Sequence, residues 1–150
     1  MNRRAFYRLS HLPPRIAYAL GLGPIIGRFV LLLTTTGRKS GLPRVTPLQY
    51  EDIDGDLYVG SARGLKSDWV RNIQANPTVA VRVKSERFQG TAHLVTDPAR
   101  IADFLEVRLQ RHPRMIAAIL RSDNVSTPPT RADLEHYAAH LALVIITRNS

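Results

Sequence analysis

The sequence predicts an α+β fold, in which an antiparallel β-barrel is accompanied by peripheral helices. Two observations predict it: strand patterns follow one another in hairpin order, and helical patterns lie between the hairpins and near the ends of the chain. The 150 residues are enough for one domain with a sizeable core. With 44% apolar and 22% charged residues, the composition is that of a globular chain rather than a disordered one. We therefore expect a single domain over residues 1–150.

The first half of the chain predicts an arm and three strands. Apolar residues at helical spacing, separated by arginines, predict a basic helical arm over residues 1–24. The aliphatic and β-branched run Phe29–Thr36 predicts a strand that is buried on both faces. Pro43–Ile53 and Leu57–Ser61 flank the tight-turn dipeptide Asp54-Gly55, and this arrangement predicts a hairpin.

The second half predicts further strands and four helices. Asp97-Pro98 supplies a cap and a proline at the first helical position, and Thr130 with Asp133 resembles a capping box. A helix that begins at Ser67 or Asp68 should be capped by one of these two residues. The expected helices are Ser67–Ala75, one after Asp97 that Pro113 ends, Arg114–Leu120, and one after Thr130, and the expected strands are Thr78–Val83, Phe88–Thr96 and Leu143–Thr147.

Positive charge is concentrated at one end of the chain. The net charge is +9, and residues 1–50 hold eight of the 21 basic residues and no Asp or Glu. Such asymmetry indicates an anionic partner, and nucleic acid, an acidic membrane surface and a phosphate-bearing cofactor all fit it. The alternative is a basic surface that serves only solubility.

Several classes of protein are excluded by composition. The absence of cysteine excludes disulfides, thiolate metal sites and a cysteine nucleophile. The longest apolar run near the N-terminus is much shorter than a membrane-spanning helix, and Pro13-Pro14 interrupts any signal-peptide pattern. We therefore expect a cytoplasmic protein. His136 and His140 have a spacing that can bind zinc, but without Cys or a following Glu the pattern favours a surface pair, so no metal site is expected.

Residues 34–44, Thr-Thr-Thr-Gly-Arg-Lys-Ser-Gly-Leu-Pro-Arg, place hydroxyls, two glycines and three cations in a connection between strands. Glycines let backbone N–H groups approach a ligand, and the cations can donate charge-assisted hydrogen bonds to phosphate or carboxylate oxygens. The segment therefore indicates an anion-binding loop. A solvated hairpin loop is the alternative on composition alone.

Three stretches of this sequence, residues 31–41, 43–48 and 69–77, resemble the deazaflavin (coenzyme F420)-dependent nitroreductase family. The resemblance implies a split β-barrel of the kind that binds flavin mononucleotide (FMN). It also implies an oxidoreductase that passes hydride from reduced coenzyme F420 to an electron-poor conjugated acceptor such as a nitro compound or a quinone. FMN is the alternative cofactor, and a non-catalytic carrier of a flavin, deazaflavin or other anionic ligand is the alternative function.

The resemblance implies cofactor-binding residues on three segments. The cations would hold the phosphate and the glutamate tail of the coenzyme, while Thr46 and Pro47 would lie against its ring. Where the family often has Ser-Lys, this chain has Ala62-Arg63, which retains the charge and removes one side-chain contact. The implied residues are Arg38, Lys39, Ser40, Gly41, Arg44, Thr46, Pro47, Ser61, Ala62, Arg63, Gly64, Trp69 and Asn72.

Two of these residues have structural interpretations as well. A lone helical tryptophan such as Trp69 is more often core than ligand contact, and Asn72 is better suited to bind backbone than cofactor. No catalytic side chain is assigned, because the cofactor itself carries the hydride. Beyond Ile101 the resemblance fades, and Tyr137 is the chief aromatic candidate for the substrate pocket.

The expected partners are a small-molecule acceptor and no nucleic acid, because aromatic residues are scarce near the arginines and no nucleic-acid-binding module is present. The basic amphipathic arm could rest on an anionic membrane, or its apolar stripe could pack on the barrel. Related split barrels commonly form dimers, so a homodimer also stays open.

Overall fold

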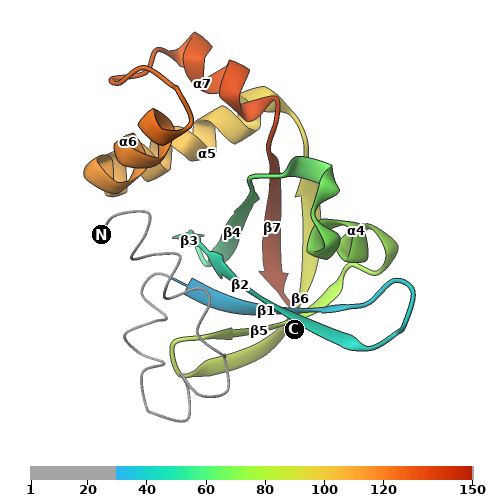
Figure 1. The fold of residues 1–150 in the computed structure, drawn as a ribbon. Coiled ribbons are helices and arrows are strands. Elements are labelled where there is room, and N and C mark those ends of the chain that lie inside the picture. Colours follow the sequence, from blue (N-terminus) through green and yellow to red (C-terminus); the bar gives the residue numbers. More distant parts are fainter. Residues whose placement is uncertain (1–29, 150) are drawn as a thin grey trace.

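A computed structural model describes residues 30–149 (Figure 1). The predicted N-terminal arm, residues 1–24, lies outside the described residues. The strands are β1 (Val30–Thr36), β2 (Pro43–Gln49), β3 (Glu51–Ile53), β4 (Asp56–Ser61), β5 (Thr78–Val83), β6 (Glu86–Val95) and β7 (Ala142–Arg148). The helices are the short 3-10 helix η1 (Gly64–Lys66) and the α-helices α4 (Asp68–Ala75), α5 (Pro98–Arg111), α6 (Pro113–Ser122) and α7 (Arg131–Ala138).

The strands form one seven-stranded sheet in the order β2-β1-β5-β6-β7-β4-β3, and every pair of neighbours is antiparallel. The two edge strands, β2 and β3, are consecutive in the chain and only Tyr50 separates them. Edges joined by one residue must lie close in space, so the sheet curls round on itself without a β2–β3 ladder. This is an open antiparallel barrel, and it confirms the predicted fold class.

Closure of the barrel also corrects one sequence-based expectation. Residues 43–53 do not form one strand: β2 pairs with β1, while β3 alone forms the hairpin with β4. The break falls at Tyr50 because one straight strand cannot lie at both edges of the sheet. The turn itself is as predicted, since Asp54 and Gly55 have φ of 53° and 92°, the two positive values that a type I′ turn requires.

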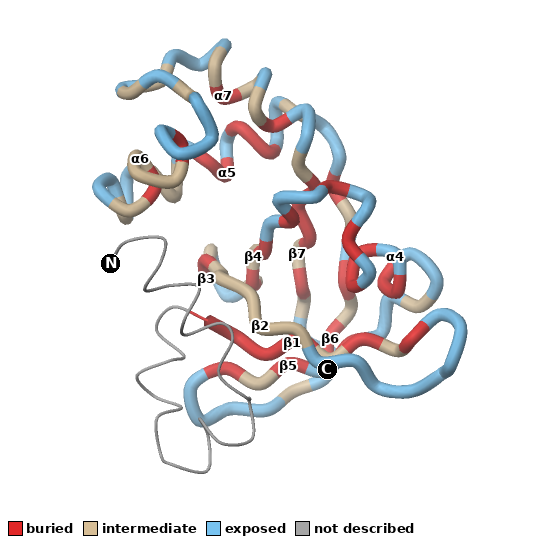
Figure 2. The backbone as a smooth tube through the Cα atoms, in the orientation of Figure 1, coloured by how far each residue is buried: buried red, intermediate tan, exposed pale blue. Residues whose placement is uncertain are grey.

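Strands β1 and β7 bury apolar side chains on both faces of the sheet, which explains the apolar run in each of them. In β7, Val144 and Ile146 face the interior of the barrel, while Leu143 and Ile145 face α5, α6 and α7. Helix α4 contributes to the interior cluster, and the three C-terminal helices cover the second cluster outside the barrel (Figures 1 and 2). In β1, residues 30–33 are all buried, as the sequence predicts.

Helix ends agree with the sequence in two cases and differ in two. The side chain of Asp97 accepts a hydrogen bond from the backbone N–H of Ala99, and Thr130 forms the predicted capping box. Ser67 precedes α4 but makes no cap bond with its side chain. Pro113 begins α6, consistent with the preference of proline for the first helical position, and His112 separates α5 from α6. Within residues 30–149, no helix combines the length and apolarity needed to cross a bilayer.

Candidate functional site

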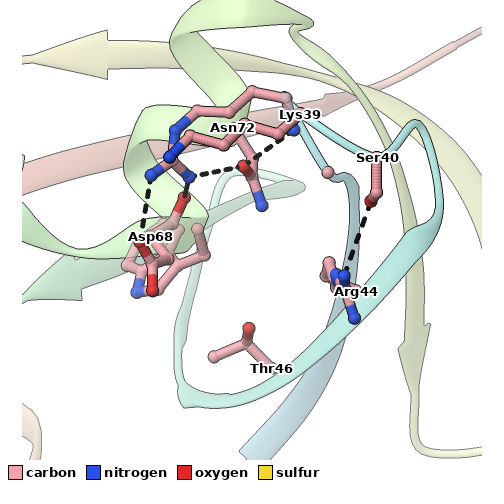
Figure 3. Close-up of a pocket in the computed structure, with 9 residues that line it drawn as sticks. Lys39, Ser40, Arg44, Thr46, Asp68 and Asn72 are labelled. Carbon is pink, nitrogen blue, oxygen red and sulfur yellow. Dashed lines mark hydrogen bonds and ion pairs between the residues drawn. The ribbon is translucent and has the colours of Figure 1, made fainter.

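A cleft of about 330 Å³ opens between the β1–β2 loop, strand β2 and the first turns of α4 (Figure 3). Seven of the residues predicted to bind the cofactor lie in its wall, together with Gly37 and Asp68, which were not among the predicted cofactor-binding residues. The nine lining residues are Gly37, Arg38, Lys39, Ser40, Arg44, Thr46, Asp68, Trp69 and Asn72.

The β1–β2 loop holds its shape through its own backbone. Gly37 donates its N–H to the carbonyl of Leu42 at 2.8 Å, and Gly41 donates to the carbonyl of Gly37 at 2.8 Å. The hydroxyl of Ser40 accepts the N–H of Leu42 at 3.1 Å. Residues 38–45 are exposed along this loop and the start of β2 (Figure 2). Lys39 and Arg44 therefore project from a loop whose backbone hydrogen bonds do not depend on them.

Asn72 fastens the loop to α4. Its side chain is buried, with 3% of its surface exposed. The Oδ1 atom accepts the backbone N–H of Arg38 at 3.2 Å and Nη1 of Arg38 at 2.9 Å, while Nδ2 donates to Oγ1 of Thr35 at 3.2 Å. Asn72 thus binds backbone and neighbouring side chains, which agrees with the structural interpretation of this residue.

The guanidinium of Arg38 is directed toward α4. Its Nη2 forms an ion pair with Oδ1 of Asp68 at 3.1 Å, and its Nη1 donates to the carbonyl of Asp68 at 3.4 Å and to Asn72. Only 25% of the Arg38 side chain is exposed, against 84% for Asp68. Both Nη atoms of Arg38 therefore bond to groups within the protein.

Lys39 and Arg44 are different, because neither forms an ion pair with any residue that the structure describes. Arg44 makes only a long contact, 3.5 Å from Nη2 to the hydroxyl of Ser40. That hydroxyl accepts from Arg44 and Leu42, so its own proton is left to donate to a ligand. Lys39, Arg44 and Ser40 together present two cations and a hydroxyl donor to the cleft, a set that suits phosphate or carboxylate oxygens.

Thr46 and Pro47 are both predicted to lie against the cofactor ring, and the alternation of side chains along β2 determines which of them reaches the cleft. Thr46 lies in its wall and pairs with Leu33, a residue of the interior cluster. The neighbouring Pro47 points to the opposite face of β2, where it pairs with Leu32. Trp69 packs in the interior cluster with only 9% of its surface exposed, and it also borders the cleft.

Ser61 lies outside the cleft wall and acts on α4 instead. It is 3% exposed, and its hydroxyl donates to the carbonyl of Gly64 at 2.9 Å. Because its single proton is used there, the hydroxyl of Ser67 is the donor in the 2.6 Å bond between the two serines. Since Ser67 immediately precedes α4, this pair positions the helix that borders the cleft.

Four further residues predicted to bind the cofactor are also outside the cleft. Ala62 and Arg63, which follow Ser61, are exposed, and Gly41 lies in the β1–β2 loop without lining the cavity. Gly64 is buried with φ of +60°, and a Cβ at this position would lie 2.9 Å from the carbonyl oxygen of His140. Gly64 is therefore required by packing between η1 and the chain that leads into β7.

Tyr137 and the histidine pair belong to the helical side of the molecule. The hydroxyl of Tyr137 donates to Oδ2 of Asp123 at 2.6 Å, and its ring packs with the cluster under α5, α6 and α7 rather than in the cleft. The rings of His136 and His140 lie edge to face, 5.9 Å apart. Within residues 30–149, no group of three His, Cys, Asp or Glu side chains is placed to hold a metal ion.

Asp68 is the site residue that sequence reasoning missed. The sequence marks it only as a residue near the start of a helix. Its partner Arg38 is 30 positions away, so no local pattern could show the pairing.

Comparison with solved structures confirms the split β-barrel. A conserved hypothetical protein from Mycobacterium tuberculosis superposes with a TM-score of 0.61 at 18% identity, covering 88% of this chain and 80% of that one. An F420-H2 dependent reductase superposes with a TM-score of 0.55 at 22% identity, covering 80% of this chain and 95% of that one. At these identities the likeness concerns the fold.

Sequence comparison supplies the family. An F420H(2)-dependent quinone reductase of Mycobacterium tuberculosis (strain H37Rv) is 46% identical over 66 residues, covering 41% of this chain and 44% of the relative. The match thus spans less than half the length of that relative. A sequence profile of the F420H(2)-dependent quinone reductase family matches residues 18–117, a range that includes every element around the cleft. The chain therefore belongs to the F420H(2)-dependent quinone reductase family.

Proposed function

We propose that this protein is an oxidoreductase that transfers a hydride from reduced coenzyme F420 to a quinone. The observation that carries the proposal is the cleft, which gathers the family-like segments of β1, β2 and α4 around two cations without ion-pair partners among the described residues. The similar mycobacterial protein is named for the same activity.

The chemistry of the donor set fits the cofactor. Coenzyme F420 carries a phosphate and a glutamate tail, and Lys39, Arg44 and the Ser40 hydroxyl offer the charge and the hydrogen-bond donors that such groups need. The volume of about 330 Å³ is at the small end of the range for ligand sites. We therefore assign the anionic part of the cofactor to this cleft.

The protein contributes binding and orientation. When bound, the reduced deazaflavin supplies the hydride, and a quinone that takes up this hydride and one proton becomes the hydroquinone. Lys39 and Arg44 hold the anionic groups. Asn72 holds the β1–β2 loop against α4, and Thr46 and Trp69 form the wall beside the cations. No side chain of the cleft has to act as an acid or a base for the hydride itself.

A turnover assay tests the proposal. Reduced F420 is mixed with the protein and a soluble quinone, and cofactor oxidation is followed by its absorbance and fluorescence. We expect quinone-dependent oxidation, with nitroaromatic compounds as a second acceptor class for comparison. A non-catalytic carrier would change the fluorescence of the cofactor without oxidising it, and this result would refute the enzyme proposal. Affinities for F420 and FMN measured in parallel identify the preferred cofactor.

Two partner predictions accompany the proposal. A homodimer stays a prediction, to be measured by light scattering of the full chain at several concentrations. Membrane contact through residues 1–24 also stays a prediction, to be measured by flotation with anionic liposomes.

A further inference from the structure

We propose that Asp68 competes with the bound anion for Arg38 and thereby sets how tightly the cleft holds a polyanionic ligand. This inference rests on the proposed function of the cleft. Asp68 acts through another side chain, that of Arg38, so it is a positioning residue.

The geometry shows what Arg38 would have to give up. Both terminal nitrogens of its guanidinium bond to α4, with the Asp68 carboxylate 3.1 Å from Nη2 (Figure 3). Lys39 and Arg44 line the same cleft without such a carboxylate partner among the described residues. An incoming phosphate or carboxylate therefore meets two available cations and a third that is already neutralised.

Asp68 is the only acidic residue among the nine that line the cleft. Its carboxylate is 84% exposed, so water and salt screen the pair, and an ion pair of this kind contributes little to folding. A weak pair can be exchanged for a ligand anion at modest cost. Asp68 also repels an anion that binds beside it. Both effects lower affinity for the anion.

During turnover the oxidised cofactor must leave the cleft, and a carboxylate at position 68 that weakens anion binding helps it to leave. The phosphate and tail of the cofactor are unchanged by hydride transfer, so their contacts stabilise the bound reduced and oxidised forms equally. Stronger tail binding would slow release of the oxidised cofactor without accelerating the chemical step. A carboxylate that offsets part of the cationic charge keeps the cofactor exchangeable.

The decisive variant is Asp68→Asn, compared with Asp54→Asn as a matched control. The control makes the same change of charge in the exposed β3–β4 turn, where asparagine tolerates the positive φ. We expect Asp68→Asn to bind F420 about two- to tenfold more tightly than the wild type, with a difference that shrinks in high salt. Asp68→Glu, which retains a carboxylate, should restore an affinity near that of the wild type.

Inorganic tripolyphosphate serves as a second probe, because it tests the cleft as an anion site without the deazaflavin. Tighter tripolyphosphate binding by Asp68→Asn, together with no F420 binding by either protein, would uphold the role of Asp68 while refuting the proposed function. An affinity for both probes that is unchanged, weakened or equal to that of Asp54→Asn overturns the inference.

The route through Arg38 is tested by repeating the substitution in an Arg38→Ala background. If Asp68 acts by holding Arg38, most of the gain disappears there, and only the direct repulsion remains. A gain of the same size in both backgrounds would show that Asp68 acts by its own charge alone, and the competition would be refuted. Cofactor turnover gives an independent readout: Asp68→Asn should lower the KM for reduced F420 without raising kcat.

Discussion

At the scale of single residues, the three cations of the cleft differ in what holds them. Arg38 is tied to α4 by Asp68 and Asn72, and it contributes to the shape of the site. Lys39 and Arg44 project from a loop that its backbone bonds already stabilise. Their loss should therefore change ligand binding more than folding.

The first prediction follows from this difference. Lys39→Ala should weaken F420 binding by about 1.5–3 kcal/mol, the range for a lost hydrogen bond to a charged group. The free energy of unfolding should barely change, since a cation in an exposed loop adds little to the core. Fluorescence titration measures the affinity, and urea unfolding measures the stability.

Lys66→Ala is the control for this experiment, because Lys66 is an exposed lysine in η1 that does not line the cleft. It should leave the affinity unchanged. An unchanged affinity in Lys39→Ala would remove Lys39 from the site. A cofactor analogue without the glutamate tail would separate a phosphate contact from a tail contact.

At the scale of elements, the segment between β4 and α4 connects three elements of the fold and lies outside the cleft. The Ser61–Ser67 hydroxyl pair and the packing of Gly64 on the His140 carbonyl connect the end of β4, the start of α4 and the entry to β7. Through these contacts, residues near Ser61 hold the start of α4, which borders the cleft, although they lie outside the cleft themselves.

The second prediction concerns Gly64 in this connecting segment. Gly64→Ala should destabilise the protein by about 2–4 kcal/mol, because a Cβ there adds a clash with a backbone oxygen to the cost of positive φ. Gly55→Ala is the control, since Gly55 also has positive φ but a Cβ added to it would have no neighbour within 4 Å. It should cost only about 1–2 kcal/mol, the cost of a left-handed backbone conformation for a residue with a Cβ. Equal losses in urea unfolding would show that the clash is relieved by movement of the chain.

At the scale of the whole molecule, an ionic cluster around the buried Glu51 joins the helical side to the edge of the barrel. Glu51 is 4% exposed and forms ion pairs with Arg108 at 3.2 Å and Arg111 at 3.3 Å. Its carboxylate also lies 3.3 Å from His112. Burial lowers the pKa of Arg108, and the neighbouring Glu51 opposes this shift. The cluster links the junction of α5 and α6 to β3, close to the point where the curled sheet turns back.

The third prediction follows from burial. Glu51→Gln should destabilise the protein by about 3–5 kcal/mol, because it leaves Arg108 buried without its counter-charge. The matched control, Glu86→Gln, removes an exposed pair with Arg148 and should cost about 1 kcal/mol or less. Thermal and urea unfolding check both values. A loss for Glu51→Gln no larger than that of the control would mean that the cluster is not integral to the packing.

The fourth prediction concerns the basic arm, residues 1–24, which lies outside the described residues. Each basic residue near an anionic bilayer contributes on the order of 1 kcal/mol, so its four arginines should give weak, salt-sensitive binding. The measurement is flotation with anionic liposomes at low and high salt, using the full chain and a chain that begins at Pro24. Failure of the full chain to float even in low salt would end the membrane proposal.

Much of the fold could be predicted because its signals are local. The Asp54-Gly55 turn, the Asp97 cap and the capping box after Thr130 each depend on residues within a few positions of one another, and all three appear as predicted. The family-like stretches likewise indicate an anion site from their side-chain types alone. Seven of the residues they implicated do meet in one cleft.

Features that depend on residues far apart in the chain could be read only from the folded structure. Curling of the sheet divides residues 43–53 between its two edges, alternation along β2 turns Thr46 into the cleft and Pro47 away, and the fold pairs Arg38 with Asp68 across 30 positions. The turns, the caps and the types of side chain available to the site follow from the local sequence alone. Which cation is neutralised and which is left for a ligand depends on strand register and helix placement, because contacts between residues far apart in the chain leave no local pattern.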